Sequence, residues 1–444
     1  MQIKTGKGTV SLMVVMAIWS LSLAVDLPGL AVTPIEGNLE TIFTGVTHFK
    51  VQLLTVLPNL VIIPFVLLSG KLSETKHKIP VILAGTVMYI VAGALSMFSG
   101  SLDALIWLSC LLGAGCGLIL PFSTGLIADV FTGKYRMKQM GIISAIGNIA
   151  LVGATFVVGF LATKSWHLPF LVYLIPLVSL VLIPFLKKIP KSDYETESTT
   201  TTASSTTGST NNGATATTTA TTTTTATQTI PAVDANGFST AGQKVSGGFY
   251  VGRTIWLLLA YFFFVFATSV PAYYLPNLMP QYHMSVEAVS TVTSIFYLAM
   301  FVIGLFVTGV MKVFRKTSFI LAGALVAGGM LMFVVFKTLP LYIIASALVG
   351  LGNGLAQPIF YTKATGVVTS ENKNTLSLAY LQVANYVAIS MVPVIIGFFS
   401  DIFGQQKSNL FPFVIVTAFC AIVLVCIIIR VRHFTFGISK NYYE

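Results

Sequence analysis

Long apolar runs restrict the fold of this chain more than any other feature of its sequence. Only 9% of the residues are charged and 55% are hydrophobic, whereas about a quarter of the residues in soluble domains are charged. A run of about 20 apolar residues can cross a bilayer as a helix, and backbone groups in hydrocarbon must be paired within their own segment. The alternating polarity of a membrane barrel is absent. We therefore predict an all-α integral membrane protein with twelve transmembrane helices, near residues 9–33, 47–69, 79–99, 104–130, 137–163, 167–186, 251–277, 286–313, 317–336, 340–365, 376–399 and 409–430.

The basic residues are distributed unevenly between the predicted loops. With the N-terminus placed in the cytoplasm, all of the 25 Lys and Arg residues fall on the cytoplasmic side except Lys50, Lys164, Lys337 and Lys407. This is the positive-inside bias, which predicts a multi-pass protein of the cell membrane with both termini in the cytoplasm. The net charge of +11 therefore reflects topology, and we expect no nucleic-acid partner.

Short stretches of the first half recur in the second half in the same order. Glycines at helical spacing let helices approach closely, and a proline allows a bend. The clearest repeat is Gly113-x-Gly115-x-Gly117-x-x-x-Pro121, which returns with identical spacing as Gly350-x-Gly352-x-Gly354-x-x-x-Pro358. The chain is therefore predicted to consist of two pseudo-symmetric six-helix bundles, with a site at the seam between them.

Composition also sets the domain boundaries. Residues 196–229 are almost entirely Thr, Ser, Ala, Gly and Asn, and such a stretch cannot bury apolar area. We predict an N-terminal bundle over 1–190, a disordered cytoplasmic linker over 191–248, a C-terminal bundle over 249–434 and a cytoplasmic tail over 435–444. The linker lets the two bundles move as separate bodies.

Two six-helix halves joined by a cytoplasmic linker resemble the major facilitator superfamily of secondary transporters, over nearly the whole chain. The loop after the second span is similar to the family signature Gly-x-Leu-x-Asp-Arg-x-Gly-Arg-Lys and reads Gly70-Lys-Leu-Ser-Glu74-Thr-Lys-His77-Lys78. Glu74 replaces the Asp, His77 occupies the second Gly position, and the first Arg is missing. The resemblance implies that Gly70, Glu74 and Lys78 form a cytoplasmic latch between the halves, together with Asp129 at the end of span four. The alternative is that the lysine only anchors topology.

An acidic residue inside the first span is the candidate for proton coupling. Asp26 falls about 17 residues into this span, or ~25 Å at 1.5 Å per residue. An acid in a span costs at least ~2.5 kcal/mol and normally faces a cavity. The alternative is that the Asp26 side chain extends to the outer interface. Proton-coupled drug exporters carry an Arg in span four where this chain has Ser109, and a Gly-Pro pair in span five that is absent here.

If the pattern of the resembled family holds, spans one, four, seven and ten line a central cavity. Asn148, Gln382 and Tyr386 on spans five and eleven could contribute to it. For each polar residue the alternative is hydrogen bonding between helices. Lys363 would select an organic anion if it faced the cavity, and would otherwise extend to the interface. The candidates for substrate contact are Tyr261, Tyr273, Asn353, Gln357, Tyr361, Lys363 and Asn385.

These features favour a secondary transporter of small amphipathic or lipophilic molecules, of the drug or metabolite efflux type, that works by alternating access. One alternative is uptake or exchange of an amphipathic organic anion such as a bile salt. An alternative of another class is a transporter-like sensor or lipid scramblase. The spans contain no His, Asp and Glu cluster and the chain contains no nucleotide-binding loop, so we expect no enzyme, cofactor or metal. The expected partners are the substrate, protons and membrane lipid, with the protein as a monomer.

Overall fold

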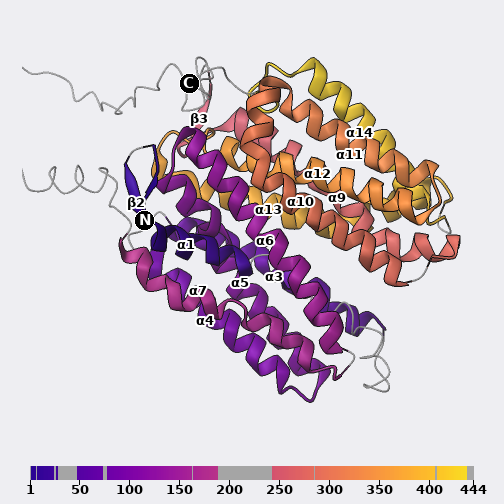
Figure 1. Ribbon diagram of the computed structural model, residues 1–444, viewed down its shortest axis with the longest axis horizontal. Helices are drawn as coiled ribbons and strands as arrows, with labels where there is room; N and C mark the ends of the chain where they lie inside the picture. Colours follow the sequence, from indigo (N-terminus) through magenta and orange to yellow (C-terminus); the bar gives the residue numbers. More distant parts are fainter. Residues whose placement is uncertain are drawn as a thin grey trace, which may run out of the picture.

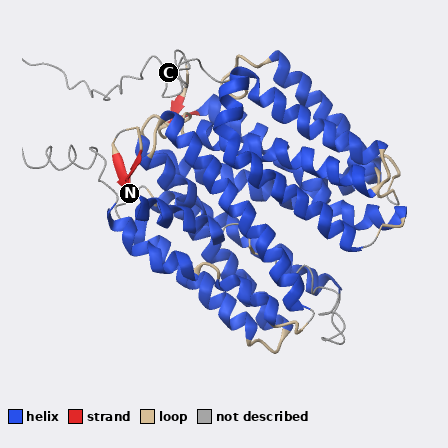
Figure 2. Cartoon of the chain, in the orientation of Figure 1, coloured by secondary structure: helices blue, strands red, loops and turns tan. Residues whose placement is uncertain are grey.

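Nearly all of the described chain is helical. The computed structural model describes residues 2–6, 8–24, 27–28, 48–73, 78–162, 164–188, 243–284, 286–405 and 408–437. Within these ranges the β-structure consists of two short hairpins (Figure 2). Asp26, Glu74 and residues 191–242 of the predicted linker lie outside the described residues. The predicted all-α membrane fold is confirmed.

The N-terminal half starts with a hairpin and continues as a helical bundle. Its elements are β1 (Gln2–Lys4), β2 (Thr9–Ser11), α1 (Leu12–Leu21), η1 (Ser22–Ala24), α3 (His48–Leu72), α4 (Lys78–Met97), α5 (Leu102–Val130), α6 (Gly133–Ala162), η3 (Leu168–Leu174), α7 (Leu177–Leu182) and η4 (Ile183–Lys188).

The C-terminal half has the same plan. Its elements are β3 (Val245–Ser246), β4 (Phe249–Tyr250), α9 (Val251–Leu278), η5 (Met279–Tyr282), α10 (Val286–Phe314), η6 (Arg315–Thr317), α11 (Ser318–Val335), α12 (Leu339–Ala364), η7 (Glu371–Lys373), α13 (Asn374–Ile402) and α14 (Phe411–Ile429).

The predicted spans coincide with apolar helical segments. Within the described residues, nine stretches are long and apolar enough to cross a membrane. One of them, Thr291–Val335, covers most of α10 and all of α11, which are consecutive helices. Two further predicted spans overlap the shorter apolar segments Leu12–Leu21 and Leu57–Leu72.

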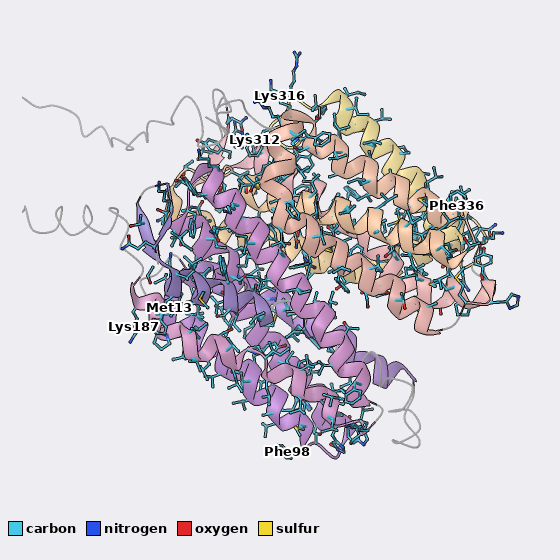
Figure 3. The ribbon with its side chains drawn as sticks, in the orientation of Figure 1. Met13, Phe98, Lys187, Lys312, Lys316 and Phe336 are labelled. Carbon is cyan, nitrogen blue, oxygen red and sulfur yellow. The ribbon has the colours of Figure 1, made fainter. Side chains whose placement is uncertain are left out.

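The two halves lie side by side and meet at one end of the molecule. Figure 1 shows the N-terminal half in indigo to magenta and the C-terminal half in salmon to yellow, converging at the end where β2 and β3 lie and diverging away from it. We call the converging end the terminal end and the other the opposite end. In Figure 3, Lys187, Lys312 and Lys316 lie at the terminal end, whereas Phe98 and Phe336 lie toward the opposite end.

The repeated glycines pack helices together inside each half. A methyl group placed on Gly113 would lie 2.6 Å from the carbonyl oxygen of Pro58 in α3. One placed on Gly354 would lie 2.9 Å from the Cα of Met300 in α10. The absence of a side chain therefore lets α5 approach α3, and α12 approach α10, in the same way in both copies. The remaining members of the cluster, Gly115, Gly117, Gly350 and Gly352, meet neighbouring helices as closely.

Each half also carries a hairpin that docks on its own loop at the terminal end. The N–H of Thr132, in the loop between α5 and α6, donates to the carbonyl oxygen of Thr5 at 3.0 Å. The N–H of Tyr250 donates to the carbonyl oxygen of Val367, between α12 and α13, at 2.9 Å. Residues 243–248, which the composition assigns to the disordered linker, therefore begin the second half, because loop 365–373 supplies partners for their backbone.

Candidate substrate cavity

A cavity of about 320 Å³ lies between the two halves in the middle of the helices. Its lining on α9 extends from Tyr261 to Tyr273, which lie ~15 Å and ~33 Å along this helix at 1.5 Å per residue. Both halves contribute: Ser22, Pro28, Asn59, Ser123, Thr124, Ile143, Ser144, Gly147, Asn148 and Leu151 from the first, and Tyr261, Val265, Thr268, Ser269, Ala272, Tyr273, Phe296, Tyr297, Met300, Asn353, Gln357, Tyr361, Gln382, Asn385, Tyr386 and Ile389 from the second.

Helical periodicity explains which side chains reach the cavity. On α12 the lining residues Asn353, Gln357 and Tyr361 are four residues apart, so they form one stripe on a helix face. On α13 the lining residues from Gln382 to Ile389 follow the same three-and-four spacing. The apolar residues between these stripes pack inside the bundle or face outward.

The structure brings six of the seven candidates for substrate contact to this cavity. Tyr261, Tyr273, Asn353, Gln357, Tyr361 and Asn385 line it. Lys363 is not among the described lining residues, which corrects its assignment to the cavity. Asn148 of span five lines the cavity as expected. Asn59 and Ser144 also line it but are not among the candidates, because span two is not expected to form a wall and Asn148 is the one polar residue considered on span five. The polar residues in these spans were the available signal.

A series of hydrogen bonds joins the two halves at the side of the cavity nearer the terminal end. The Ser144 hydroxyl of α6 donates to Gln357 Oε1 at 2.7 Å. Gln357 Nε2 donates to the Tyr361 hydroxyl at 2.9 Å, and Gln382 Nε2 donates to the same oxygen at 3.2 Å. The Tyr261 hydroxyl donates to Asn385 Oδ1 at 3.4 Å. These side chains form one polar layer that joins α6 to α12 and α13.

The halves are held together on the terminal-end side of this polar layer by a buried arginine. Arg136, at the start of α6, is 6% exposed. Its guanidinium donates to the carbonyl oxygens of Ala128 and Phe131, both at 2.8 Å, and so caps the end of α5. It also donates to Thr365 Oγ1 of the other half at 2.7 Å. Because a guanidinium stays charged and presents several donors in fixed geometry, one side chain serves both purposes.

Glycines bring the halves into close contact along three helix pairs. A methyl group on Gly70 of α3 would lie 2.5 Å from the Cβ of Ala379 in α13. Gly125 of α5 meets the side chain of Thr375 in α13, and Gly141 of α6 meets Gly304 in α10. These contacts leave no room for a side chain at any of the three glycines, so the terminal end is closed.

The remaining latch residues form an ion pair inside the N-terminal half. Lys78 Nζ lies 2.9 Å from Asp129 Oδ2, and the two side chains are 31% and 22% exposed. The pair joins the start of α4 to the end of α5, so it does not itself cross between the halves. A partly exposed pair of this kind contributes ~0–1 kcal/mol. Contact with the other half comes from Gly70 on the adjoining helix.

Lys363 is bound by the end of the chain instead of facing the cavity. Lys363 is 5% exposed, and its ammonium donates to the carbonyl oxygens of Phe434 and Gly437. The Arg253 guanidinium lies 4.5 Å from the Phe434 ring centroid. Burial, followed by the charges of Arg430, Lys363 and Arg253, lowers the pKa of His433, so its Nδ1 can accept the N–H of Thr435 at 3.4 Å. Residues 433–437 therefore fold back onto the C-terminal half, including 435–437 of the predicted tail.

Removal of residues 433–444 is expected to destabilise the protein by leaving the Lys363 ammonium buried without these carbonyl acceptors. Loss of one partner of a buried charge costs ~3 kcal/mol or more. Lys363→Met in the truncated protein should restore part of the lost thermal stability, because it removes the charge. Thermal unfolding in detergent is followed for the full-length and the truncated protein, each with and without Lys363→Met. The four unfolding temperatures measure the coupling between Lys363 and residues 433–444. Equal unfolding temperatures of the truncated protein with and without Lys363→Met would contradict it.

Similarity to known proteins agrees with this architecture. The family model described as Major Facilitator Superfamily matches residues 9–256 and again residues 257–436. The chain belongs to the major facilitator superfamily. It is 33% identical over 85 residues to the multidrug transporter protein MdtP of Bacillus subtilis, covering 19% of this chain and 16% of that one. It is 28% identical over 144 residues to the quinolone resistance protein NorA of Staphylococcus aureus, covering 31% and 36%.

The likeness in structure extends over the whole chain. The proton:xylose symporter XylE superposes with a TM-score of 0.70 over 97% of this chain and 98% of that one, at 13% sequence identity. The matches to the two bacterial relatives span well under half of their lengths. The chain is therefore a membrane-spanning carrier of this superfamily, which is a non-enzymatic family.

Proposed function

We propose that this protein is a secondary active carrier that exports small amphipathic molecules across the cell membrane by alternating access. The observation that carries the proposal is a cavity walled by both halves, beyond which the halves are joined by Arg136, Thr365 and close glycine contacts. In such carriers the two halves rock about a site near the midplane, so the site opens to one side at a time.

The terminal end would face the cytoplasm. The positively charged loops of membrane proteins remain on that side, and the labelled Lys187, Lys312 and Lys316 all lie at the terminal end in Figure 3. Both chain ends are then cytoplasmic. With this orientation the contacts at the terminal end close the cytoplasmic side, and the structure corresponds to an outward-facing state.

Export is favoured by the relatives and by the position of Lys363. NorA is a quinolone resistance protein and MdtP is a multidrug transporter. Uptake of an organic anion would need a cation in the cavity. The Lys363 ammonium does not serve this purpose, because it donates to the carbonyl oxygens of Phe434 and Gly437 and does not line the cavity. The cavity combines polar groups with Phe296, Met300 and Ile389, as an amphipathic solute requires.

Proton coupling through Asp26 is part of the proposal and has a direct test. The purified protein is reconstituted into liposomes, a pH gradient is imposed, and accumulation of amphipathic fluorescent solutes that are cationic, anionic or neutral is followed. Gradient-driven accumulation is expected for the wild type and for Asp401→Asn, a control at an exposed acid near the end of α13. It should be lost in Asp26→Asn, because an amide cannot release a proton.

The same assay separates the alternatives. Unchanged accumulation in Asp26→Asn would remove proton coupling from the proposal and leave the carrier function. Rapid exchange of labelled lipid between leaflets, without transport of any solute, would contradict the carrier function and favour a scramblase.

A further inference from the structure

The described part of the cavity wall is polar but carries no formal charge. None of its described lining residues is Asp, Glu, Lys, Arg or His. Hydroxyl groups come from serines and threonines of both halves and from five tyrosines of the C-terminal half. Carboxamides come from both halves as well: Asn59, Asn148, Asn353, Gln357, Gln382 and Asn385.

Several of these carboxamides have hydrogen-bonding capacity that the described protein does not use. A carboxamide offers two donors and an acceptor with two lone pairs. Asn148 is 5% exposed, and its described bond is from Nδ2 to the carbonyl oxygen of Ser144. Gln382 is 3% exposed and uses Nε2 toward Tyr361. Asn353 reaches only the weak sulfur acceptor of Met300, at 3.6 Å. The amide oxygens of Asn148, Gln382 and Asn353 accept no hydrogen bond from the described residues.

An amide oxygen that has no described protein partner and lines a cavity is available to a ligand, and a ligand that displaces water there must supply a donor in its place. The three oxygens lie on α6, α12 and α13, so one small molecule between these helices can reach groups of both halves. The matching partner for such oxygens is a donor such as a hydroxyl group. The neighbouring tyrosines and Gln357 can in turn accept from or donate to the same hydroxyl groups.

We infer that the cavity binds an uncharged molecule with several hydroxyl groups on one face and a ring or apolar part on the other. This inference rests on the proposed function and specifies its substrate class. The hydroxyl-bearing face would bond to Asn148, Asn353 and Gln382. The apolar part would lie against Val265, Phe296 and Ile389, which line the same cavity.

A formal charge would be poorly accommodated by the described part of this wall. Taking an isolated ion out of water costs several kcal/mol even after relaxation, unless an opposite charge repays it. Carboxamides and hydroxyls supply dipoles only. A molecule of about the size of a monosaccharide with one small ring attached suits the volume, because 320 Å³ is near the lower limit of ligand pockets.

A matched series of probes tests the charge preference directly. Phenyl β-glucoside is neutral, phenyl β-glucuronide differs by carrying a carboxylate, and phenyl 6-amino-6-deoxy-β-glucoside differs by carrying an ammonium. Binding to the purified full-length protein is measured by isothermal titration and by ligand-induced thermal stabilisation. The glucoside should bind at least ~10-fold more tightly than either charged analogue, in line with the cost of an unpaired charge.

Variants of the carboxamides connect binding to this wall. Asn353→Leu and Gln382→Leu should each weaken binding of the glucoside by ~10-fold, about the value of one hydrogen bond to a buried group. Gln281→Leu is the matched control, because Gln281 is exposed in η5 and does not line the cavity. Thermal unfolding without probe separates loss of binding from loss of folding.

The possible results separate this inference from the proposed function. Tighter binding of either charged analogue, or no binding of the glucoside, would overturn the inferred substrate class. If gradient-driven transport of a charged amphipathic solute persists in liposomes in that case, the carrier function stands. If no solute binds or is transported, the proposed function falls with it. Equal effects of Gln281→Leu and Asn353→Leu would also overturn the inference.

Discussion

Replacement of Gly141 by Val is expected to reduce transport by more than ~10-fold, by opening the terminal end of the carrier. A methyl group on Gly141 would lie 2.6 Å from the carbonyl oxygen of Gly304 and against the side chain of Val307. The carbonyl belongs to the α10 backbone and cannot move aside alone, so α6 and α10 must separate. Overpacking of this kind costs ~1–3 kcal/mol, and a difference of 1.4 kcal/mol changes a conformational equilibrium tenfold.

The same helix supplies the control for this substitution. A methyl group on Gly153 of α6 meets no heavy atom of the described structure within 4 Å, so Gly153→Val should transport as the wild type does. Accessibility of a cysteine introduced at Ala364, which is 1% exposed, reports opening of the terminal end when the four native cysteines are replaced. Labelling by a soluble maleimide should rise in Gly141→Val and stay low in Gly153→Val. Equal labelling in both variants would show that the close contact of α6 and α10 does not hold this end closed.

Arg136→Gln is expected to destabilise the folded protein by ~2–4 kcal/mol and to weaken the closed terminal end. A hydrogen bond from a charged group contributes ~1.5–3 kcal/mol, and Arg136 donates to Ala128 O, Phe131 O and Thr365 Oγ1. A glutamine is shorter and has fewer donors, so the end of α5 loses its cap. Lys138→Gln, on the same helix and exposed, is the control and should change stability by less than ~0.5 kcal/mol.

Thr365→Val separates the two roles of Arg136. This variant removes the acceptor in the other half and leaves both bonds to α5 carbonyl oxygens. Unfolding in detergent should then change little, whereas labelling of a cysteine at the terminal end and the transport rate should change in the direction seen for Arg136→Gln. If Thr365→Val leaves both the labelling and the transport rate as in the wild type, Arg136 acts only as a helix cap.

Local sequence properties were sufficient for the membrane spans and for most of the cavity-lining candidates. Each span is an apolar run long enough to cross a bilayer, and this requirement acts residue by residue along the chain. Polar side chains such as Asn353 and Gln357 are conspicuous within such runs, and their four-residue spacing places them on one face of α12. Six of the seven candidates for substrate contact could therefore be predicted from the sequence alone, because they line the cavity in the structure.

Partners that are distant in the sequence could not be predicted in this way. The sequence leaves Lys363 either to the cavity or to the membrane interface, because its position on span ten gives no sign of the carbonyl oxygens of Phe434 and Gly437, 71 and 74 residues later. The sequence indicates for Arg136 only a place on the cytoplasmic side, although its guanidinium donates to Thr365, 229 residues later in the chain. Residues 243–248 read as linker because the loop that pairs with them lies beyond residue 365.

The sequence by itself therefore determined that this protein is a two-part helical membrane protein, and which helix faces are polar. Hydropathy and periodicity are local, so they can be read directly from neighbouring residues. The tertiary structure alone decided which polar helix faces lie opposite one another across the cavity and which end of the molecule is closed. It also decided that the Lys363 ammonium is bound by the carbonyl oxygens of Phe434 and Gly437. These outcomes depend on packing between helices far apart in the chain, where the absence of a side chain at Gly141 or the reach of Arg136 determines what can meet.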